Sequence, residues 1–414
     1  MIDVEKHYII KPEKEFGKPG STSLASKLVL CIYFALSIYE PYLNGILGSI
    51  TKYYIFFTIF ILVYQYHGDL YPTSVSKTMV VWLLYKFISL LWSQDYSTPR
   101  LHYISQLGMV LFLFVLFSYD FDEDTLRWIE ITYWLSSGVV GLLSLFYSQP
   151  YHGMLEARQV LVIAGVEIDP NNQAALLMVG ICISLVNLFY KKKLVIVSVL
   201  ILLINIYGCF LTASRAALIT VIVAVLFCII LPGEKKKLSA IIGRLLLTIG
   251  FILAAFYLAQ RLNPDVYNRL FYLPGYAGGS GRSQQWANVW QAYTNDPVSV
   301  IFGLGWGSST KLTGVFSQDG SYLATHNTFL TMLCDVGLIG TLVFMVPIIC
   351  MSSYLVKKRN HFPIMLLIVQ FVPAFFIDAI NKRFFWNAIF ILGMYYNHYA
   401  FRDDTVSVHD TNCD

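Results

Sequence analysis

The chain has 414 residues and a net charge of +4; 57% of the residues are hydrophobic and only 13% are charged. Soluble domains carry roughly 25% charged residues. The composition therefore excludes a disordered chain, a secreted disulfide scaffold and an ordinary cytosolic enzyme. It indicates a protein dissolved mostly in lipid, and no basic tract interleaved with aromatic residues suggests nucleic-acid binding.

Hydropathy predicts an all-α polytopic membrane protein with about twelve transmembrane helices, since a bilayer core of about 30 Å needs roughly 20 apolar residues per helix. Helices one to nine are expected within 25–258 and helices ten to twelve within 326–400. Residues 1–24 and 401–414 are expected to be cytoplasmic tails, and 259–325 a long external loop. The predicted spans are 25–39, 46–65, 78–94, 103–119, 126–147, 172–190, 194–212, 216–232, 238–258, 326–349, 362–378 and 384–400.

The orientation follows from three runs of cations, at 191–193, 235–237 and 357–359. They fall after predicted spans six, eight and ten, which is one side of the membrane. Short loops rich in Lys and Arg stay in the cytoplasm. The loops 148–171 and 259–325, together with the turn at 212–215, are therefore expected outside.

Three arginines, Arg158, Arg215 and Arg282, lie at or near these outer helix ends, against the positive-inside trend. A lipid phosphate or a local acid such as Glu156 or Asp296 would be an ordinary partner. The alternative is an anionic substrate entering from the outer leaflet, because guanidinium groups match phosphate oxygens bidentately.

Two of the outer helix starts carry capping signals. Asp169 is a good N-cap and Pro170 suits the first helical position, so this pair predicts the start of span six. In the turn at 212–215, Ser214 or Thr212 can cap span eight. A helix N-terminus attracts anions, so Arg215 is either a phosphate ligand or a snorkelling surface arginine.

The long loop is predicted to carry a short amphipathic helix after Arg282. Its apolar face consists of positions spaced i, i+3, i+4 and i+7, namely Trp286, Val289, Trp290 and Tyr293. Such a face either packs against the protein, lies at the lipid headgroups or offers a platform for sugar stacking. The run Gly303-Leu304-Gly305-Trp306-Gly307 has no βαβ context and predicts a bent loop rather than a dinucleotide site.

His326 follows the long loop and opens span ten, with Thr325 as its expected N-cap. The helix dipole there should lower the pKa of the imidazole, and the neutral form can accept a proton from a hydroxyl. Asn327 could orient a sugar or the ring. A structural histidine is the alternative. Asp335, deeper in the same helix, needs a partner and is either functional or architectural.

The segment from His326 to Gly340, HNTFLTMLCDVGLIG, resembles the motif of the bacterial O-antigen ligase and O-antigen polymerase superfamily: a histidine, an amide residue, and later a glycine and a small residue. The upstream run GRSQQWANVWQAYTNDPVSVIFGLGWG is similar too, as are SRAA at 214–217 and DPNNQAAL at 169–176. The resemblance covers about residues 155–345. Asp335 departs from it, since the family more often has glutamate there.

The resemblance implies an outward-facing cavity under the long external loop. It also implies a metal-independent glycosyltransferase, without cofactor, that uses an undecaprenyl-pyrophosphate-linked glycan as donor. The acceptor would be lipid A core or a second lipid-linked glycan. Such an enzyme lies in the bacterial inner membrane with its active site facing the periplasm, and direct displacement by the acceptor oxygen would invert the anomeric centre.

The roles carried over by the resemblance fall on outer-face residues. Arg215 and Arg282 would bind the pyrophosphate with Arg158 assisting, and His326 would act at the acceptor hydroxyl or the departing phosphate. The residues expected to be catalytic are therefore His326, Arg282 and Arg215, and those expected to bind substrate are Arg158, Asn327 and Trp286.

The motifs do not separate a ligase from a polymerase. A transporter or flippase of the lipid-linked oligosaccharide is an alternative, but it should show paired repeats and charges near the midplane of several helices. A membrane-bound O-acyltransferase also uses a histidine and an asparagine, although its histidine is expected deep in the bundle.

Overall fold

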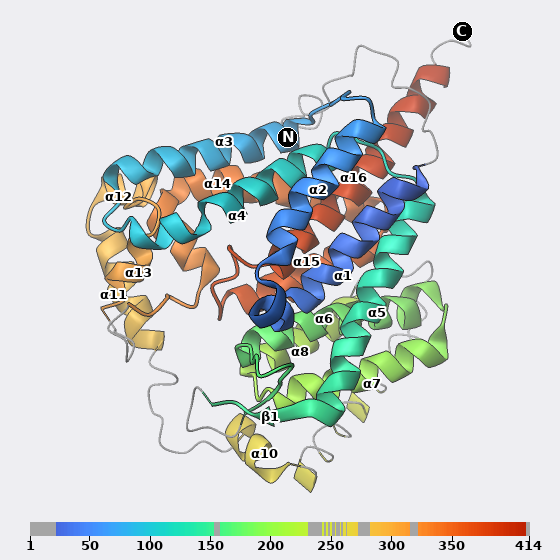
Figure 1. The fold of residues 1–414 in the computed structure, drawn as a ribbon, viewed down its shortest axis with the longest axis vertical. Coiled ribbons are helices and arrows are strands. Elements are labelled where there is room, and N and C mark those ends of the chain that lie inside the picture. Colours follow the sequence, from blue (N-terminus) through green and yellow to red (C-terminus); the bar gives the residue numbers. More distant parts are fainter. Residues whose placement is uncertain are drawn as a thin grey trace.

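The computed structural model describes residues 22–152, 158–230, 263–271, 282–314 and 322–410, together with single residues between 242 and 261. These residues form a bundle of long helices with one small antiparallel hairpin, made of β1 (Ser148–Pro150) and β2 (Gln159–Leu161). Figure 1 shows the hairpin at the lower end of the bundle and the end of the last helix at the upper end.

Most predicted spans coincide with a helix. The apolar helices are α1 (Leu24–Leu47), α2 (Ile50–Gln65), α3 (Ser74–Ile88) with η2 (Ser89–Trp92), α4 (Ser97–Leu116), α5 (Glu123–Tyr147), α6 (Pro170–Val186) with η3 (Asn187–Lys191), α7 (Val195–Leu211), α8 (Arg215–Ile230), α14 (Thr328–Lys357), α15 (His361–Ala374) and α16 (Arg383–Asp410). The predicted span 238–258 lies largely outside the described residues. The last helix continues past residue 400, into the segment expected to be a tail.

Five of these helices are long and apolar enough to cross a bilayer: α1, α3 with η2, α5, α6 with η3, and α14. Five more are apolar but shorter, and they lie in α2, α4, α7, α8 and α15. The protein is therefore a helical, multi-pass membrane protein, and the number of twelve crossings stays a prediction.

The segment expected to be a loop with one helix contains several, which are α10 (Pro264–Phe271), α11 (Arg282–Thr294), α12 (Pro297–Phe302) and α13 (Ser308–Leu312). The predicted amphipathic helix is confirmed as α11, but its buried face differs from the expected one. Val289 and Tyr293 are buried with Leu330 of α14, whereas Trp290 is 52% exposed. The face thus packs against the protein.

α6 lies at the centre of the bundle, in contact with α5, α7, α8 and α15. Almost all its side chains are buried, and small residues let its neighbours approach. A Cβ at Gly180 would collide with Asn205 of α7 and Ser137 of α5. The Ser137 hydroxyl accepts a hydrogen bond from the Gly180 amide at 3.0 Å. This packing holds the middle of α6 in the bundle, and the start of the same helix contributes to the site described next.

Candidate functional site

The start of α14 is capped by Asn327, not by Thr325 as expected. The Asn327 Oδ1 atom accepts hydrogen bonds from the amides of Phe329 and Leu330, each at 3.1 Å. The Thr325 hydroxyl instead bonds to the hydroxyl of Thr331. Asn is as good an N-cap as Asp or Ser, so the helix begins two residues later than predicted. Contact of Asn327 with a glycan stays a prediction.

His326 lies just before this cap, with its backbone in the left-handed region at φ 51°. A non-glycine residue rarely adopts this conformation, and such strain is typical of functional positions. Burial lowers the pKa of the imidazole, and the positive charges of Arg282 and Lys382 lower it further, while Asp169 opposes them. The direction matches the sequence-based expectation, but burial and neighbouring cations are the causes.

Arg282 is the first residue of α11 and lies beside His326. Its Nη1 atom donates to the carbonyl oxygen of Phe376 at 2.8 Å, which ties α11 to the segment between α15 and α16. Burial lowers the pKa of this guanidinium; Asp169 raises it and the charge of Arg158 lowers it. Residues from four separate parts of the sequence therefore interact here.

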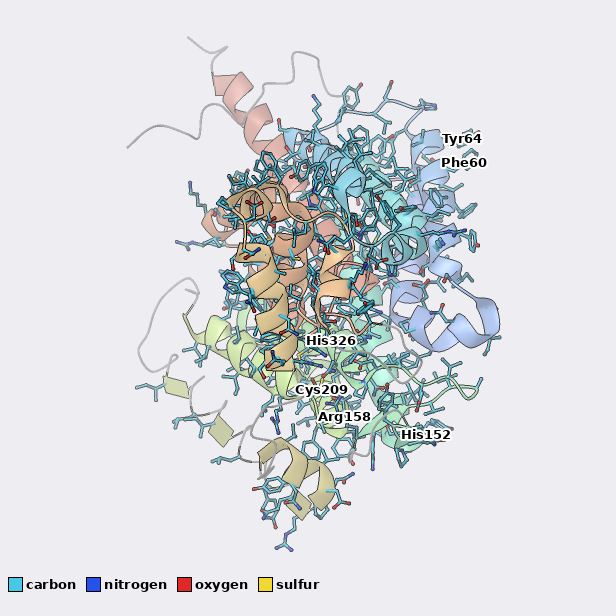
Figure 2. The ribbon with its side chains drawn as sticks, turned by 90° about the vertical axis from the view of Figure 1, so that its left-hand side faces the viewer. Phe60, Tyr64, His152, Arg158, Cys209 and His326 are labelled. Atoms are coloured by element: carbon cyan, nitrogen blue, oxygen red, sulfur yellow. The ribbon has the colours of Figure 1, made fainter. Side chains whose placement is uncertain are left out.

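Arg158 directly precedes β2, and the hairpin positions it near Arg282. Its carbonyl accepts a hydrogen bond from the amide of Tyr151 at 2.9 Å. Next to it, the amide of Leu161 in β2 donates to Oε1 of Gln173 in α6 at 2.9 Å. The Arg158 side chain is only 8% exposed, and Figure 2 shows it below His326 in the same part of the molecule.

Asp169 is the carboxylate next to these cations. As predicted, it caps α6 and accepts hydrogen bonds from the amides of Asn171 at 2.9 Å and Asn172 at 3.2 Å. Sequence reasoning assigned it this structural role alone. The structure adds an electrostatic one, since its charge acts on both Arg282 and His326.

Lys382 is the cation that sequence reasoning missed. It lies before α16, and the start of α14 holds this segment in place. The Thr328 hydroxyl donates to the carbonyl of Ile377 at 2.8 Å and accepts from the amide of Ala379 at 2.7 Å. The positive-inside argument would have found Lys382, because Lys382 and Arg383 also lie at the predicted outer end of a span.

Arg383 itself is structural. Its Nε atom lies 3.5 Å from a carboxylate oxygen of Glu40 and donates to the hydroxyl of Thr51 at 3.2 Å. These contacts link α16 to α1 and α2.

Arg215 lies at the edge of the group rather than inside it. It begins α8, and its side chain is exposed. The preceding Ser214 caps the helix, as predicted, by accepting from the amide of Ala217 at 3.3 Å, and its hydroxyl donates to Oδ1 of Asn171 at 2.8 Å. The starts of α6 and α8 are thereby joined.

Trp286 is fixed on the same side by its indole, whose Nε1 atom donates to the carbonyl of Thr325 at 2.7 Å. Its ring is partly buried against the small core between α11 and α14. This hydrogen bond links α11 to the residue before His326, so Trp286 has a structural role at the site. Contact of Trp286 with a substrate stays a prediction.

Asp335 proves to be architectural. Its carboxylate accepts from the amides of Gly307 and Ser309, both at 2.9 Å, and its carbonyl accepts from the amide of Gly305 at 3.0 Å. The glycine run forms the predicted bent loop, with positive φ at all three glycines. It packs against α14, which is interrupted at Gly337 (φ 65°, ψ −172°), where a Cβ would strike the backbone of Ile301.

We call His326, Arg158, Arg282, Lys382 and Asp169 the His326 group. Arg282, Lys382 and Asp169 act on the imidazole, whose pKa is lowered chiefly by burial, and Arg158 acts on Arg282. Such a set can bind an anion and accept a proton. Within the described ranges no three His, Cys, Asp or Glu side chains gather as ligands of a metal ion.

The fold and the His326 group together define a multi-pass membrane protein with a group of cations, one carboxylate and one histidine at one end of its bundle. Residues 199–345 match the family model described as O-antigen ligase. This segment is therefore similar to the O-antigen ligase family, which supports the resemblance to the O-antigen ligase and O-antigen polymerase superfamily drawn from the motifs. No curated protein matches the chain.

The matched segment is shorter than the resemblance, which begins near residue 155. It contains Arg215, Arg282 and His326, whereas Arg158 and Lys382 lie outside it. The His326 group therefore unites residues of the matched segment with residues that only the fold brings to them.

Proposed function

We propose that the protein is a glycosyltransferase that moves a glycan from an undecaprenyl-pyrophosphate donor to an acceptor hydroxyl at the outer face of the bacterial inner membrane. The observation that carries this proposal is that the charges of Arg282 and Lys382, together with burial, lower the pKa of His326, while Arg158 acts in turn on Arg282. Outside the cell there is no nucleotide sugar, so an activated donor there has to be linked to a lipid.

The cations suit the leaving group of this reaction. When the bond between the anomeric carbon and the phosphate oxygen breaks, its electron pair goes to the pyrophosphate, whose negative charge grows. Positive groups that are already in place stabilise this charge without reorganisation. The bond to Phe376 uses one of the five N–H donors of Arg282 and fixes the direction of the guanidinium.

His326 suits the acceptor. A neutral imidazole accepts the proton of the acceptor hydroxyl while its oxygen attacks the anomeric carbon from the face opposite the pyrophosphate. The product keeps the new glycosidic bond with inverted configuration. In this scheme Arg215 guides the pyrophosphate at the entrance, and Asn327 and Trp286 contact the glycan from the start of α14 and from α11.

The reaction needs no metal in this proposal, since the guanidinium and ammonium groups supply the positive charge. The acceptor decides between two activities. With lipid A core as acceptor the protein is an O-antigen ligase, and with a second lipid-linked glycan it is a polymerase.

Reconstitution in liposomes with a defined undecaprenyl-pyrophosphate-linked repeat tests the proposal. A ladder of products formed without lipid A core identifies a polymerase, and a product that forms only with lipid A core identifies a ligase. Either product should form equally well in EDTA. Movement of the lipid across the bilayer without a new glycosidic bond would identify a flippase instead.

A further inference from the structure

A polar cavity lies at the end of the bundle opposite the His326 group. It has a volume of about 510 Å³ and lies between the start of α5, the η3 segment after α6, the turn from α14 to α15 and the end of α16. The His326 group lies at the starts of α6, α14 and α16, and this cavity lies at their other ends. The two sites are therefore separated by the length of the bundle.

The cavity lining carries an excess of positive charge. Its five permanent cations are Arg127, Lys191, Lys193, Arg359 and Arg402, and its two carboxylates are Glu123 and Glu130, which gives a formal charge of +3. Lys191 donates to Glu130 at 2.6 Å, and the hydroxyl of Tyr395 donates to the same carboxylate at 3.3 Å. Glu130 is thus paired with Lys191, and the lining as a whole keeps its excess of positive charge.

The turns that carry these cations have fixed conformations. Lys192, Leu194 and Arg359 have positive φ angles of 51°, 50° and 56°. The amides of Lys192 and Lys193 both donate to the carbonyl of Asn187, which itself lines the cavity. The helix ends thus place basic side chains around a cavity of set shape.

Part of the cavity lining, which we call the apolar wall, consists of Leu126, Ile131, Ile183 and Leu194, and Leu194 is 55% exposed. Trp128 of α5, which follows the lining residue Arg127, is 56% exposed. A small soluble anion would gain nothing from such a wall, whereas the acyl chains of a lipid would lie along it.

We propose that this cavity binds the phosphate headgroup of an anionic phospholipid, with the acyl chains running over the apolar wall at Leu194. Basic pockets between membrane helices bind anionic headgroups, and the Arg side chains offer phosphate a bidentate contact. The proposal does not depend on the glycosyltransferase function, since its readout is lipid binding at the other end of the protein.

The test uses the full chain in phosphatidylcholine nanodiscs, titrated with phosphatidylglycerol and followed by native mass spectrometry and thermal unfolding. Phosphatidylglycerol should bind saturably and raise the Tm, whereas additional phosphatidylcholine should do neither. Glycerol 1-phosphate serves as the soluble arm and should bind at least tenfold more weakly. Equal binding of this soluble phosphate would overturn the lipid assignment.

A matched pair of double variants locates the site. Lys193→Gln with Arg359→Gln should weaken phosphatidylglycerol binding at least tenfold. Lys77→Gln with Lys357→Gln removes the same charge from exposed positions outside the cavity lining and should change binding less than twofold. Equal losses in both pairs would mean diffuse surface attraction and would reject the site, and an unchanged helical circular dichroism spectrum excludes misfolding as the cause.

Discussion

Asp335 and His326 lie on the same stretch of chain, and the sequence marks both as candidates, yet the structure gives them opposite surroundings. The Asp335 carboxylate receives two backbone amides from the glycine loop. His326 instead lies among cations that oppose its protonation. At Asp335 a carboxylate joins the glycine loop to α14 through hydrogen bonds, whereas at His326 several positive charges lie close together.

This difference separates architecture from function. A buried charge whose hydrogen bonds are satisfied stabilises the fold. Gathered cations destabilise it, and a protein keeps such an arrangement where a ligand of opposite charge uses it. Substitution of His326 or Arg282 should therefore reduce transfer while leaving the fold intact, whereas substitution of Asp335 should destabilise the fold while changing transfer little.

The largest effect is expected for His326→Ala. Loss of a general base costs about 10²–10⁴-fold in rate, so glycan transfer should fall by that range while expression and Tm stay unchanged. The control is His152→Ala, because His152 is an exposed histidine at the same end, 3.2 Å from Glu167. Normal polymer from cells carrying His326→Ala would show that the imidazole is not the general base.

The next effect is expected for Arg282→Lys, which keeps the charge but loses the planar fork. Removal of one well-placed donor at a developing oxyanion costs about 10²-fold or more, and turnover of purified donor should fall accordingly. Arg100→Lys makes the same exchange at an exposed position at the start of α4 and should be silent. Wild-type turnover by the Arg282 variant would reject the pyrophosphate clamp.

Asp335→Asn tests the architectural half of the comparison. Asn retains one acceptor oxygen but presents an NH₂ group to the second amide. Loss of a hydrogen bond to a charged group costs about 1.5–3 kcal/mol, so the Tm should fall, while turnover per folded molecule should change little. Asp69→Asn, at an exposed turn, should leave the Tm unchanged. A stable but inactive Asp335 variant would show that this carboxylate belongs to the functional site.

The sequence predicted most of the apolar helices and the caps at Asp169 and Ser214, because hydropathy and capping are local signals. It predicted the direction of the His326 pKa shift, but through the helix dipole rather than through burial. The cap at Asn327 was missed, since two neighbouring residues could each cap the helix. Lys382 was overlooked although it lies at a predicted outer helix end, and its approach to His326 depends on tertiary packing through Thr328 and the segment before α16.

A smaller effect is expected for Arg215→Lys. The family resemblance places this residue at the pyrophosphate, but its side chain is exposed. Exposed charge pairs contribute about 0.2–1 kcal/mol, so kcat/KM should fall about fivefold at most, mainly through KM. A loss as large as that of Arg282→Lys would place Arg215 inside the centre of the group.

The finest test shifts the pKa of His326 in both directions. Burial and the charges of Arg282 and Lys382 lower this pKa, and Asp169 raises it. The base is active when neutral, so transfer should be lost as the pH falls through the pKa.

Lys382→Gln removes a positive charge, so the pKa of His326 should rise and the acid limb of the kcat/KM profile should move to higher pH. Asp169→Asn keeps a good N-cap but removes the opposing charge, so the limb should move to lower pH. Lys311→Gln, an exposed lysine of α13, should leave it in place. Displacement of the limb in the same direction by both variants would mean that another group controls the acid side of the profile.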